Sequence, residues 1–171
     1  VFIIHARKAW LEGLSPKENR EIPPLDYPLV YRLKQRFPDL RIIINGGIET
    51  LDQTQTHLKK VDGVMVGRAA YKTPYFLADI DRLIFGAGEA PLSRDEIVER
   101  LIPYAEKLVA QNTPLHALTR HLMGLYQGCP GGRLWWRYLS ENAVGANVSA
   151  AVLQGALDVV QAQRERAALA S

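Results

Sequence analysis

Apolar residues in the first half of the chain fall into short continuous runs, and each run is followed by an amphipathic helical pattern. The predicted strands occupy residues 1–5, 41–45 and 64–66. Helical spacing of apolar side chains occupies residues 26–37, 51–60 and 75–85. Continuous β-branched runs are typical of strands buried on both faces of a parallel sheet. We therefore predict three strand–helix units whose strands run parallel through right-handed crossovers.

The second half of the chain has helical patterns and no strand signal. The predicted helices occupy residues 93–111, 114–126, 133–142 and 148–168. Ser93 and Glu96 have the spacing of a capping box at the start of the first of these helices. A stretch rich in glycine, alanine and proline at residues 86–91 separates the two halves. We therefore expect an α/β domain over residues 1–87 and a small antiparallel helical bundle over residues 88–171.

Glycine-containing turns follow the second and third predicted strands. They are Asn45-Gly46-Gly47 and Gly67-Arg68. Glycine lets a backbone approach a ligand closely, and a following helix offers N–H groups and a positive dipole end to an anion. The Arg68 guanidinium adds a permanently charged donor. The pattern predicts a phosphate site, although two ordinary strand–helix turns have the same local sequence.

His5 and the loop after it carry further polar chemistry. His5 ends the first predicted strand, where barrels and open α/β sheets place their ligands, although a histidine facing water there fits the sequence too. The connection over residues 7–25 is longer than most strand–helix loops. It mixes cations with Trp10 and Asn19, which suits an anionic, aromatic partner such as RNA. The alternative is a solvated loop held by its prolines.

Cations and aromatic residues also alternate over residues 113–140, where no acidic residue occurs. Such a surface can bind phosphates and stack on exposed bases. The alternative puts Trp135 and Leu139 in the core and leaves the arginines as a solvated face. Cys129 has no general base near it in sequence, so we interpret it as structural. We interpret His57, on a predicted helix, as a surface or packing residue.

Bulk properties set outer limits on the function. The chain has 171 residues, a formal net charge of +3 and one cysteine. The single cysteine excludes a disulfide framework and makes a reducing compartment, here the cytoplasm, the default. No apolar run approaches the roughly 20 residues of a membrane-spanning helix. Because three strand–helix units cannot close a barrel, and the chain opens inside a strand, we expect a fragment.

Five motifs together resemble those of the tRNA-dihydrouridine synthases, and of the A-type bacterial subfamily in particular. They are His5-Ala6-Arg7, residues 14–20, Asn45-Gly46-Gly47-Ile48, residues 62–69, and Gly132-Arg133-Leu134-Trp135. The resemblance implies an FMN-binding α/β TIM barrel, of which residues 1–87 hold the last three strands, and an all-α domain over residues 88–171 that helps to bind tRNA. These enzymes reduce uridine to 5,6-dihydrouridine in the D-loop, at position 20 and often 20a, and NADPH reduces the flavin.

The resemblance also implies roles for individual residues. The expected FMN-binding residues are His5, Asn45, Gly46, Gly47, Gly67 and Arg68. The expected tRNA contacts are Lys17, Glu18, Arg20, Arg133 and Trp136. The family's catalytic cysteine lies upstream of the His-Ala-Arg motif, so we expect this chain to be inactive alone. We expect no metal site, no membrane partner and a monomer.

Three alternatives remain open at this stage. The chain could belong to another FMN-dependent TIM-barrel oxidoreductase, such as a dihydroorotate dehydrogenase relative, although that would not account for the basic, aromatic helical region. It could be a non-enzymatic RNA-binding module, which would bind tRNA in a salt-dependent manner without retaining flavin. It could also be a structural helical partner domain with neither property.

Overall fold

A computed structural model describes residues 1–145 and 147–170. The chain divides into two compact units, Val1–Ala70 and Tyr71–Ser171. The division falls before the linker at residues 86–91 that the composition indicates. We describe each unit by itself.

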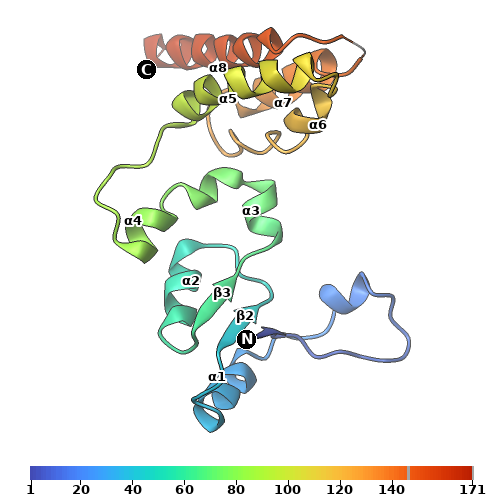
Figure 1. The fold of residues 1–171 in the computed structure, drawn as a ribbon, viewed down its shortest axis with the longest axis vertical. Helices are drawn as coiled ribbons and strands as arrows, with labels where there is room; N and C mark the ends of the chain where they lie inside the picture. Colours follow the sequence, from blue (N-terminus) through green and yellow to red (C-terminus); the bar gives the residue numbers. More distant parts are fainter. Residues whose placement is uncertain (146, 171) are drawn as a thin grey trace. The chain divides into compact units, whose positions relative to one another are not determined.

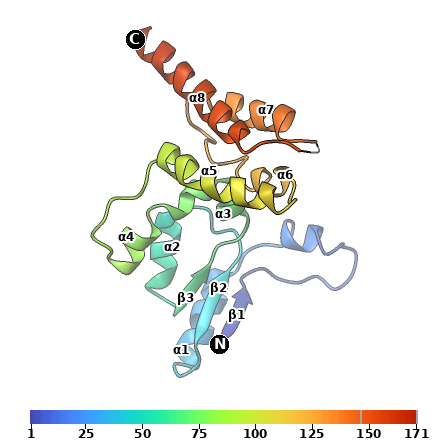
Figure 2. The same ribbon diagram turned by 45° about the horizontal axis from the view of Figure 1, so that its top comes forward.

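The first unit is built on an open sheet of three parallel strands in the order β1-β2-β3 (Figures 1 and 2). The strands are β1 (Phe2–His5), β2 (Ile42–Asn45) and β3 (Gly63–Met65). Ile44 of β2 pairs with Ile4 of β1 and with Val64 of β3. This register confirms the predicted parallel pairing. The sheet does not close into a barrel within the described residues.

Two α-helices and one 3₁₀ helix connect these strands. They are η1 (Glu18–Arg20), α1 (Tyr27–Arg36) and α2 (Leu51–Leu58). The Asp26 side chain caps α1 by accepting from the Leu29 N–H, and Thr50 and Gln53 form a complete capping box at α2. The apolar faces of the helices and strands meet in one cluster, which contains Ala6, Val30, Ile42, Ile44, Ile48 and Val61. The cluster fixes the ends of the strands, where the loops emerge.

The prediction that the first strand is buried on both faces is wrong for β1. Phe2 and Ile3 are 54% and 59% exposed, because β1 is an edge strand that pairs only with β2 among the described residues. The buried strand is β2, whose Ile42 and Ile44 are covered almost completely. A continuous apolar run gives the strand but not its place in the sheet.

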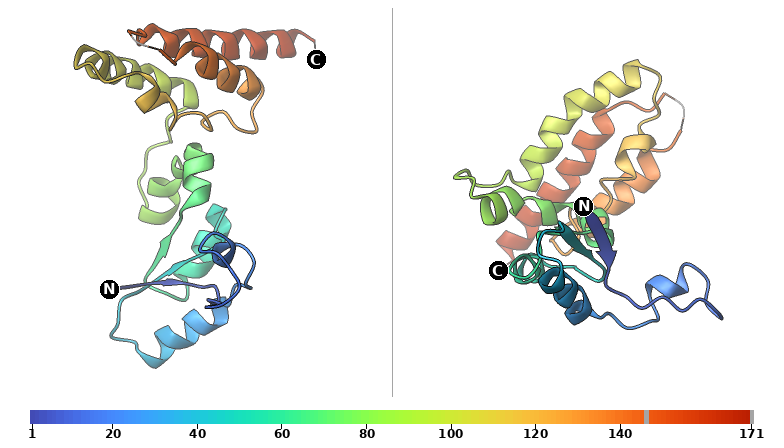
Figure 3. Two further views of the ribbon diagram at one scale, coloured as in Figure 1. Left: turned by 90° about the vertical axis from the view of Figure 1, so that its right-hand side faces the viewer. Right: turned by 60° about the horizontal axis from the view of Figure 1, so that its bottom comes forward.

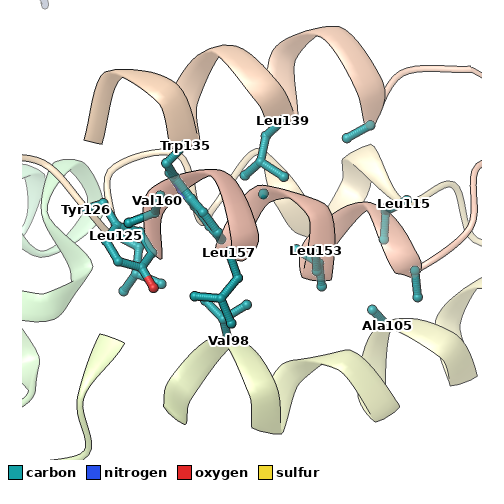
Figure 4. Packing of buried hydrophobic residues seen from close by; sticks show 13 residues of the cluster. Val98, Ala105, Leu115, Leu125, Tyr126, Trp135, Leu139, Leu153, Leu157 and Val160 are labelled. Atoms are coloured by element: carbon teal, nitrogen blue, oxygen red, sulfur yellow. The ribbon is translucent and has the colours of Figure 1, made fainter. Parts of the chain in front are cut away.

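The second unit is helical. Its elements are η2 (Pro74–Leu77), α4 (Ile80–Phe85), α5 (Arg94–Ala110), α6 (His116–Thr119), α7 (Gly132–Asn142) and α8 (Ala151–Leu169), and α3 (Arg68–Lys72) spans the division between the units. The helix α8 packs against both α5 and α7 (Figure 3). Between them, Trp135 and Tyr126 lie close together, and Val98 of α5 faces Leu157 of α8 (Figure 4). The Ser93–Glu96 capping box starts α5 as predicted.

Two predicted helices are shorter in the structure. The helix predicted over residues 75–85 is split into η2 and α4, and Leu83 of α4 is exposed. The helix predicted over residues 114–126 keeps only α6, followed by turns whose N–H groups bond three residues back. The carbonyls of Leu122 and Leu125 accept from Trp135 Nε1 and Arg94 Nε instead of continuing a helix. Leu115 and Leu125 still point into the core.

A polar cluster joins three segments of the helical unit. The Asp95 carboxylate on α5 accepts from Tyr126 Oη at 2.8 Å, from Arg164 Nη1 at 2.9 Å and from Gln161 Nε2 at 3.2 Å. Burial acts to raise the pKa of Asp95, but these hydrogen bonds outweigh it and hold the pKa below its ordinary value. None of the described helices is both long and apolar enough to span a membrane.

Candidate phosphate-binding site

A hollow of about 250 Å³ lies at the carboxyl ends of the three strands. We call it the strand-end hollow, and its lining residues are His5, Arg20, Asn45, Gly46, Gly47, Ile48, Glu49, Met65, Gly67, Arg68 and Ala69. The structure thus brings together all six residues that the sequence nominated for the cofactor. It also places Arg20, nominated for tRNA, at the same hollow. The convergence follows from the parallel sheet, whose strands all end at one edge.

The turn after β2 requires both of its glycines. Gly46 and Gly47 have positive φ values of 117° and 65°, which side chains rarely adopt. A Cβ on Gly46 would lie 3.1 Å from His5 Cε1, and one on Gly47 would lie 2.6 Å from Leu25 Cδ1. Gly67 differs, because a Cβ there would meet nothing within 4 Å. Neighbouring side chains therefore crowd the backbone at Gly46 and Gly47, whereas the position of a Cβ at Gly67 is free of neighbours within 4 Å.

The Asn45 side chain fixes the orientation of His5. Asn45 Nδ2 donates to the Met65 carbonyl at 2.7 Å, and since a carbonyl only accepts, Asn45 Oδ1 must face the other way. That oxygen lies 2.8 Å from His5 Nδ1. His5 therefore carries a proton on Nδ1, and in the neutral imidazole Nε2 is left as an acceptor. One amide thus ties β1, β2 and β3 together at the hollow.

The charges of the side chains around the hollow cancel. Arg68 Nη1 lies 3.0 Å from Glu21 Oε1, in an ion pair whose side chains are 60% and 50% exposed. Arg20 and Glu49 line the hollow with opposite charges. Exposed ion pairs contribute little free energy, so an anion can compete with Glu21 for Arg68. With two cations and two carboxylates present, backbone N–H groups must contribute much of any affinity for phosphate.

The capping box of α2 takes only some of the N–H groups that the helix after Gly47 was expected to offer. The N–H groups of Glu49 and Thr50 donate to Gln53 Oε1, and the Gln53 N–H donates to Thr50 Oγ1. The capping box therefore occupies the end of the helix. Among the residues that the structure describes, no acceptor takes the N–H of Gly47 or Ile48. The N–H groups of Leu51 and Asp52 likewise have no acceptor among the described residues, so free donors lie both in the turn and in the first turn of α2.

The loop over residues 7–25 is held by its own polar groups. The Asn19 side chain bonds to the Trp10 backbone at 2.9 and 2.8 Å. Arg7 Nη1 donates to the carbonyls of Glu21 and Pro23, which ties the end of the loop to its start. In Figure 1 the loop extends away from the sheet and carries η1. The bonds within the loop show that it has a defined shape.

Three of the nominated tRNA residues lie on this loop: Lys17 precedes η1, and Glu18 and Arg20 are in it. Lys17 immediately precedes η1 and is exposed. Glu18 is turned back onto its own loop, because its carboxylate accepts from the Ser15 N–H at 2.8 Å. Hydrogen bonds from Ser15 lower the pKa of Glu18. The geometry gives Glu18 a role in shaping the loop, while Lys17 presents a free cation.

The helix α7 separates its core residues from its cations. Trp135 and Leu139 are buried, whereas Arg133, Trp136 and Arg137 are exposed along one side of the helix. The interpretation that puts Trp135 and Leu139 in the core is therefore confirmed, while nucleic-acid contact by the exposed residues stays a prediction. The backbone enters α7 through a positive φ at Gly131.

The structure also gives roles to residues that the sequence alone did not single out. Tyr27 Oη donates to the Gly46 carbonyl at 2.8 Å, and Glu21 pairs with Arg68. His57, expected to be a surface or packing residue, is buried with its Nδ1 2.7 Å from Tyr31 Oη. Tyr27 could have been suspected, since the first turn of a helix that follows a strand lies at the sheet edge where ligands bind. Glu21 had no such signal.

Known proteins share this sequence over almost its whole length. The dihydrouridine synthase (Dus) family matches residues 1–162. A tRNA-dihydrouridine(20/20a) synthase of Salmonella typhi is 56% identical over 164 residues, which are 96% of this chain and 49% of the relative. The Escherichia coli K12 protein of the same name is 55% identical over 96% of this chain and 48% of its own length.

A third relative of that name, from Shewanella oneidensis, is 59% identical over 142 residues, covering 83% of this chain and 42% of the relative. The chain thus spans about half the length of the curated relatives it matches. Its open three-stranded α/β unit is consistent with part of a TIM barrel. With the family match covering all three strands, the strand-end hollow and most of the helical unit, this chain belongs to the dihydrouridine synthase family.

Proposed function

We propose that this chain is the flavin-phosphate and tRNA-binding part of an FMN-dependent tRNA-dihydrouridine(20/20a) synthase. The observation that carries the proposal is the strand-end hollow, where His5, the Gly46–Gly47 turn and Arg68 meet. Residues 1–87 would form the last three strand–helix units of the barrel, and residues 88–171 the helical tRNA-binding domain. We infer a cytoplasmic monomer.

The hollow fits a phosphate monoester bound through its backbone. Gly46 and Gly47 line the hollow with backbone, and the N–H groups of Gly47 and Ile48 have no acceptor among the described residues. Arg68 supplies a guanidinium once Glu21 is displaced. His5, held by Asn45, offers Nε2 to the isoalloxazine end. When bound, FMN supplies the hydride that reduces the uracil ring, and NADPH then reduces the flavin again.

Substrate tRNA would contact cations on both units. Lys17 and Arg20 are on the loop that follows β1, and Glu18 keeps that loop in shape through Ser15. On α7, Arg133 offers a cation and Trp136 a ring for stacking. Each phosphate contact adds to the salt dependence of binding. The family's catalytic cysteine would come from a barrel segment that this chain does not include.

The test uses an Escherichia coli strain lacking its tRNA-dihydrouridine(20/20a) synthase. The strain receives a graft in which this chain replaces the segment that it matches in the K12 relative, and tRNA is analysed for dihydrouridine by mass spectrometry. We expect the graft to restore the modification and to purify with a flavin absorbance band. We expect the 171-residue chain alone to restore none.

The matched control is a graft carrying Asn45→Leu, which removes the amide that orients His5. The site is supported if the parent graft restores dihydrouridine and the Asn45→Leu graft does not. A colourless graft that leaves the tRNA unmodified, or activity of the chain by itself, would contradict the proposal. Salt-dependent tRNA binding by a graft that contains no flavin would favour the RNA-binding module instead.

A further inference from the structure

We propose that Tyr27 is a positioning residue for the flavin phosphate, because its hydroxyl selects one orientation of the peptide between Gly46 and Gly47. The inference rests on the proposed function, since it concerns how the same hollow binds its ligand. Tyr27 does not line the hollow. It acts from behind the turn, through the backbone.

The argument starts from the geometry of one peptide. Tyr27 Oη donates to the Gly46 carbonyl oxygen at 2.8 Å. This peptide is trans, as are all peptides in the described part of the chain. In a planar trans peptide the C=O and N–H bonds point in opposite directions. Since the carbonyl of Gly46 points at Tyr27, the N–H of Gly47 points away from Tyr27.

The residues next to the turn show which side of its backbone faces the strand-end hollow. A Cβ built on Gly47 would meet Leu25 Cδ1 at 2.6 Å and Tyr27 Oη at 3.2 Å, so these two side chains press on one side of the backbone. Gly46 and Gly47 line the hollow, whereas Leu25 and Tyr27 do not. The N–H of Gly47, which no described residue accepts, is left for a ligand.

The choice of orientation is not made by the glycines themselves. Glycine adopts positive and negative φ about equally readily, so a Gly-Gly peptide can rotate with little steric cost. If this peptide rotated, the carbonyl oxygen of Gly46 would face the hollow in place of the Gly47 N–H, and it would repel a phosphate. The charges of the side chains around the hollow cancel. Reversing the dipole of the peptide between Gly46 and Gly47 should therefore change the affinity for phosphate. The hydrogen bond from Tyr27 favours the productive orientation.

Tyr27 is itself held rigidly. Its ring meets the ring of buried His57 edge-on, with centroids 4.5 Å apart, and His57 Nδ1 lies 2.7 Å from Tyr31 Oη. Burial raises the pKa of Tyr27, as does the nearby Tyr31, so the hydroxyl stays protonated and able to donate. The residue therefore has a fixed ring, a fixed donor and one acceptor.

The experiment compares FMN with riboflavin, which has the same ring system without the phosphate. Dissociation constants are measured by flavin fluorescence for the graft defined above, in its parent form and with Tyr27→Phe. We expect Tyr27→Phe to weaken FMN binding about three- to tenfold, the effect of one hydrogen bond. We expect its riboflavin affinity to stay within about twofold of the parent, because only the phosphate contacts the turn.

The matched control is Tyr104→Phe, which removes an exposed tyrosine hydroxyl from α5 and touches neither the turn nor the residues that hold Tyr27. It should leave the ratio of FMN to riboflavin affinity unchanged. An unchanged ratio in Tyr27→Phe, or an equal loss of both flavins, would overturn the inference and make Tyr27 a purely structural residue. If the parent graft binds neither flavin, the proposed function fails first, and the inference fails with it.

Discussion

The helical unit and the sheet unit differ in how completely they bury their apolar side chains. In the helical unit, Trp135, Leu139 and Leu153 are almost fully inaccessible to solvent. In the sheet unit, Ile44 is equally buried, but the edge strand exposes Phe2 and Ile3. The strand-end hollow lies in this second, more open unit. The larger buried cluster therefore lies in the unit that does not contain the strand-end hollow.

This difference predicts two kinds of mutational effect. Close packing stabilises the helical unit, so changes there should appear as lost stability. The turn in the sheet unit is shaped by a few hydrogen bonds, from Asn45 and Tyr27, so changes there should appear as lost affinity. The following predictions test this contrast, beginning with the largest effect.

Trp135→Ala should destabilise the protein most. The side chain is fully buried, its ring centroid lies 4.8 Å from that of Tyr126, and Nε1 donates to the Leu122 carbonyl at 2.9 Å. Truncation leaves a cavity and removes the indole hydrogen bond, so we expect a loss of about 3–5 kcal/mol. Urea unfolding, followed by the negative circular-dichroism band of α-helices at about 222 nm, measures the loss.

Trp136 provides the control for this prediction. It is the neighbouring residue on α7 and is 56% exposed. We expect Trp136→Ala to change stability by less than about 0.5 kcal/mol while weakening tRNA binding. If both substitutions cost the same stability, the separation of core and surface along α7 is wrong.

Asp95→Asn should have the next largest effect. The carboxylate joins α5 to Tyr126 and Arg164, and hydrogen bonds to charged groups are worth about 1.5–3 kcal/mol. The depressed pKa of Asp95 sets the sign of the pH dependence. Its stabilising effect is present above the unfolded-state pKa of about 4 and is lost as the pH falls through the folded-state pKa.

The measurement is a series of urea titrations between pH 7 and pH 2.5. The parent should lose stability more steeply than Asp95→Asn below about pH 4, so the two curves converge in acid. Asp158→Asn, on the surface of α8, serves as the control. Parallel curves at all pH values would show that the cluster around Asp95 does not depend on its charge.

Much of the site could be predicted from the sequence. Parallel strands end at one edge, so three strand ends carrying His5, Asn45-Gly46-Gly47 and Gly67-Arg68 had to meet. Local rules also gave the capping box at Ser93, because its partner Glu96 lies only three residues away. What is determined within a few residues, or by the direction of the chain, can be read from the pattern.

Contacts between distant residues could not be predicted. In the segment expected to be helical over residues 114–126, the carbonyls of Leu122 and Leu125 accept from Trp135 and Arg94, which lie far away in the sequence. The pairing of Glu21 with Arg68 spans 47 residues. The spacing of apolar residues does not predict such contacts, because each contact depends on the completed fold.

Gly47→Ala should reduce affinity more than stability. The positive φ of 65° makes any side chain unfavourable at this position, and the new Cβ would press on Leu25. The turn must shift, so we expect FMN affinity in the graft to fall about tenfold or more. Gly67→Ala, where a Cβ meets nothing within 4 Å, should cost less than about threefold. Equal losses would mean that the two turns contribute alike.

Glu21→Gln should have the smallest effect, and in the opposite direction. Glu21 pairs with Arg68 on an exposed surface, and a phosphate that binds Arg68 must displace it. Removing the negative charge should therefore raise FMN affinity by about two- to fivefold, since exposed pairs are worth less than about 1 kcal/mol. Salt screens exposed charges, so the gain should shrink as ionic strength rises.

Glu12→Gln, in the same loop, removes one negative charge at an exposed position and is the control for net charge. It should leave FMN affinity within about 1.5-fold of the parent, since screening weakens distant charges. Weaker FMN binding by Glu21→Gln would reverse the interpretation. Glu21 would then orient the Arg68 guanidinium for the ligand instead of competing for it, and the hollow would depend on its loop as well as on its strand ends.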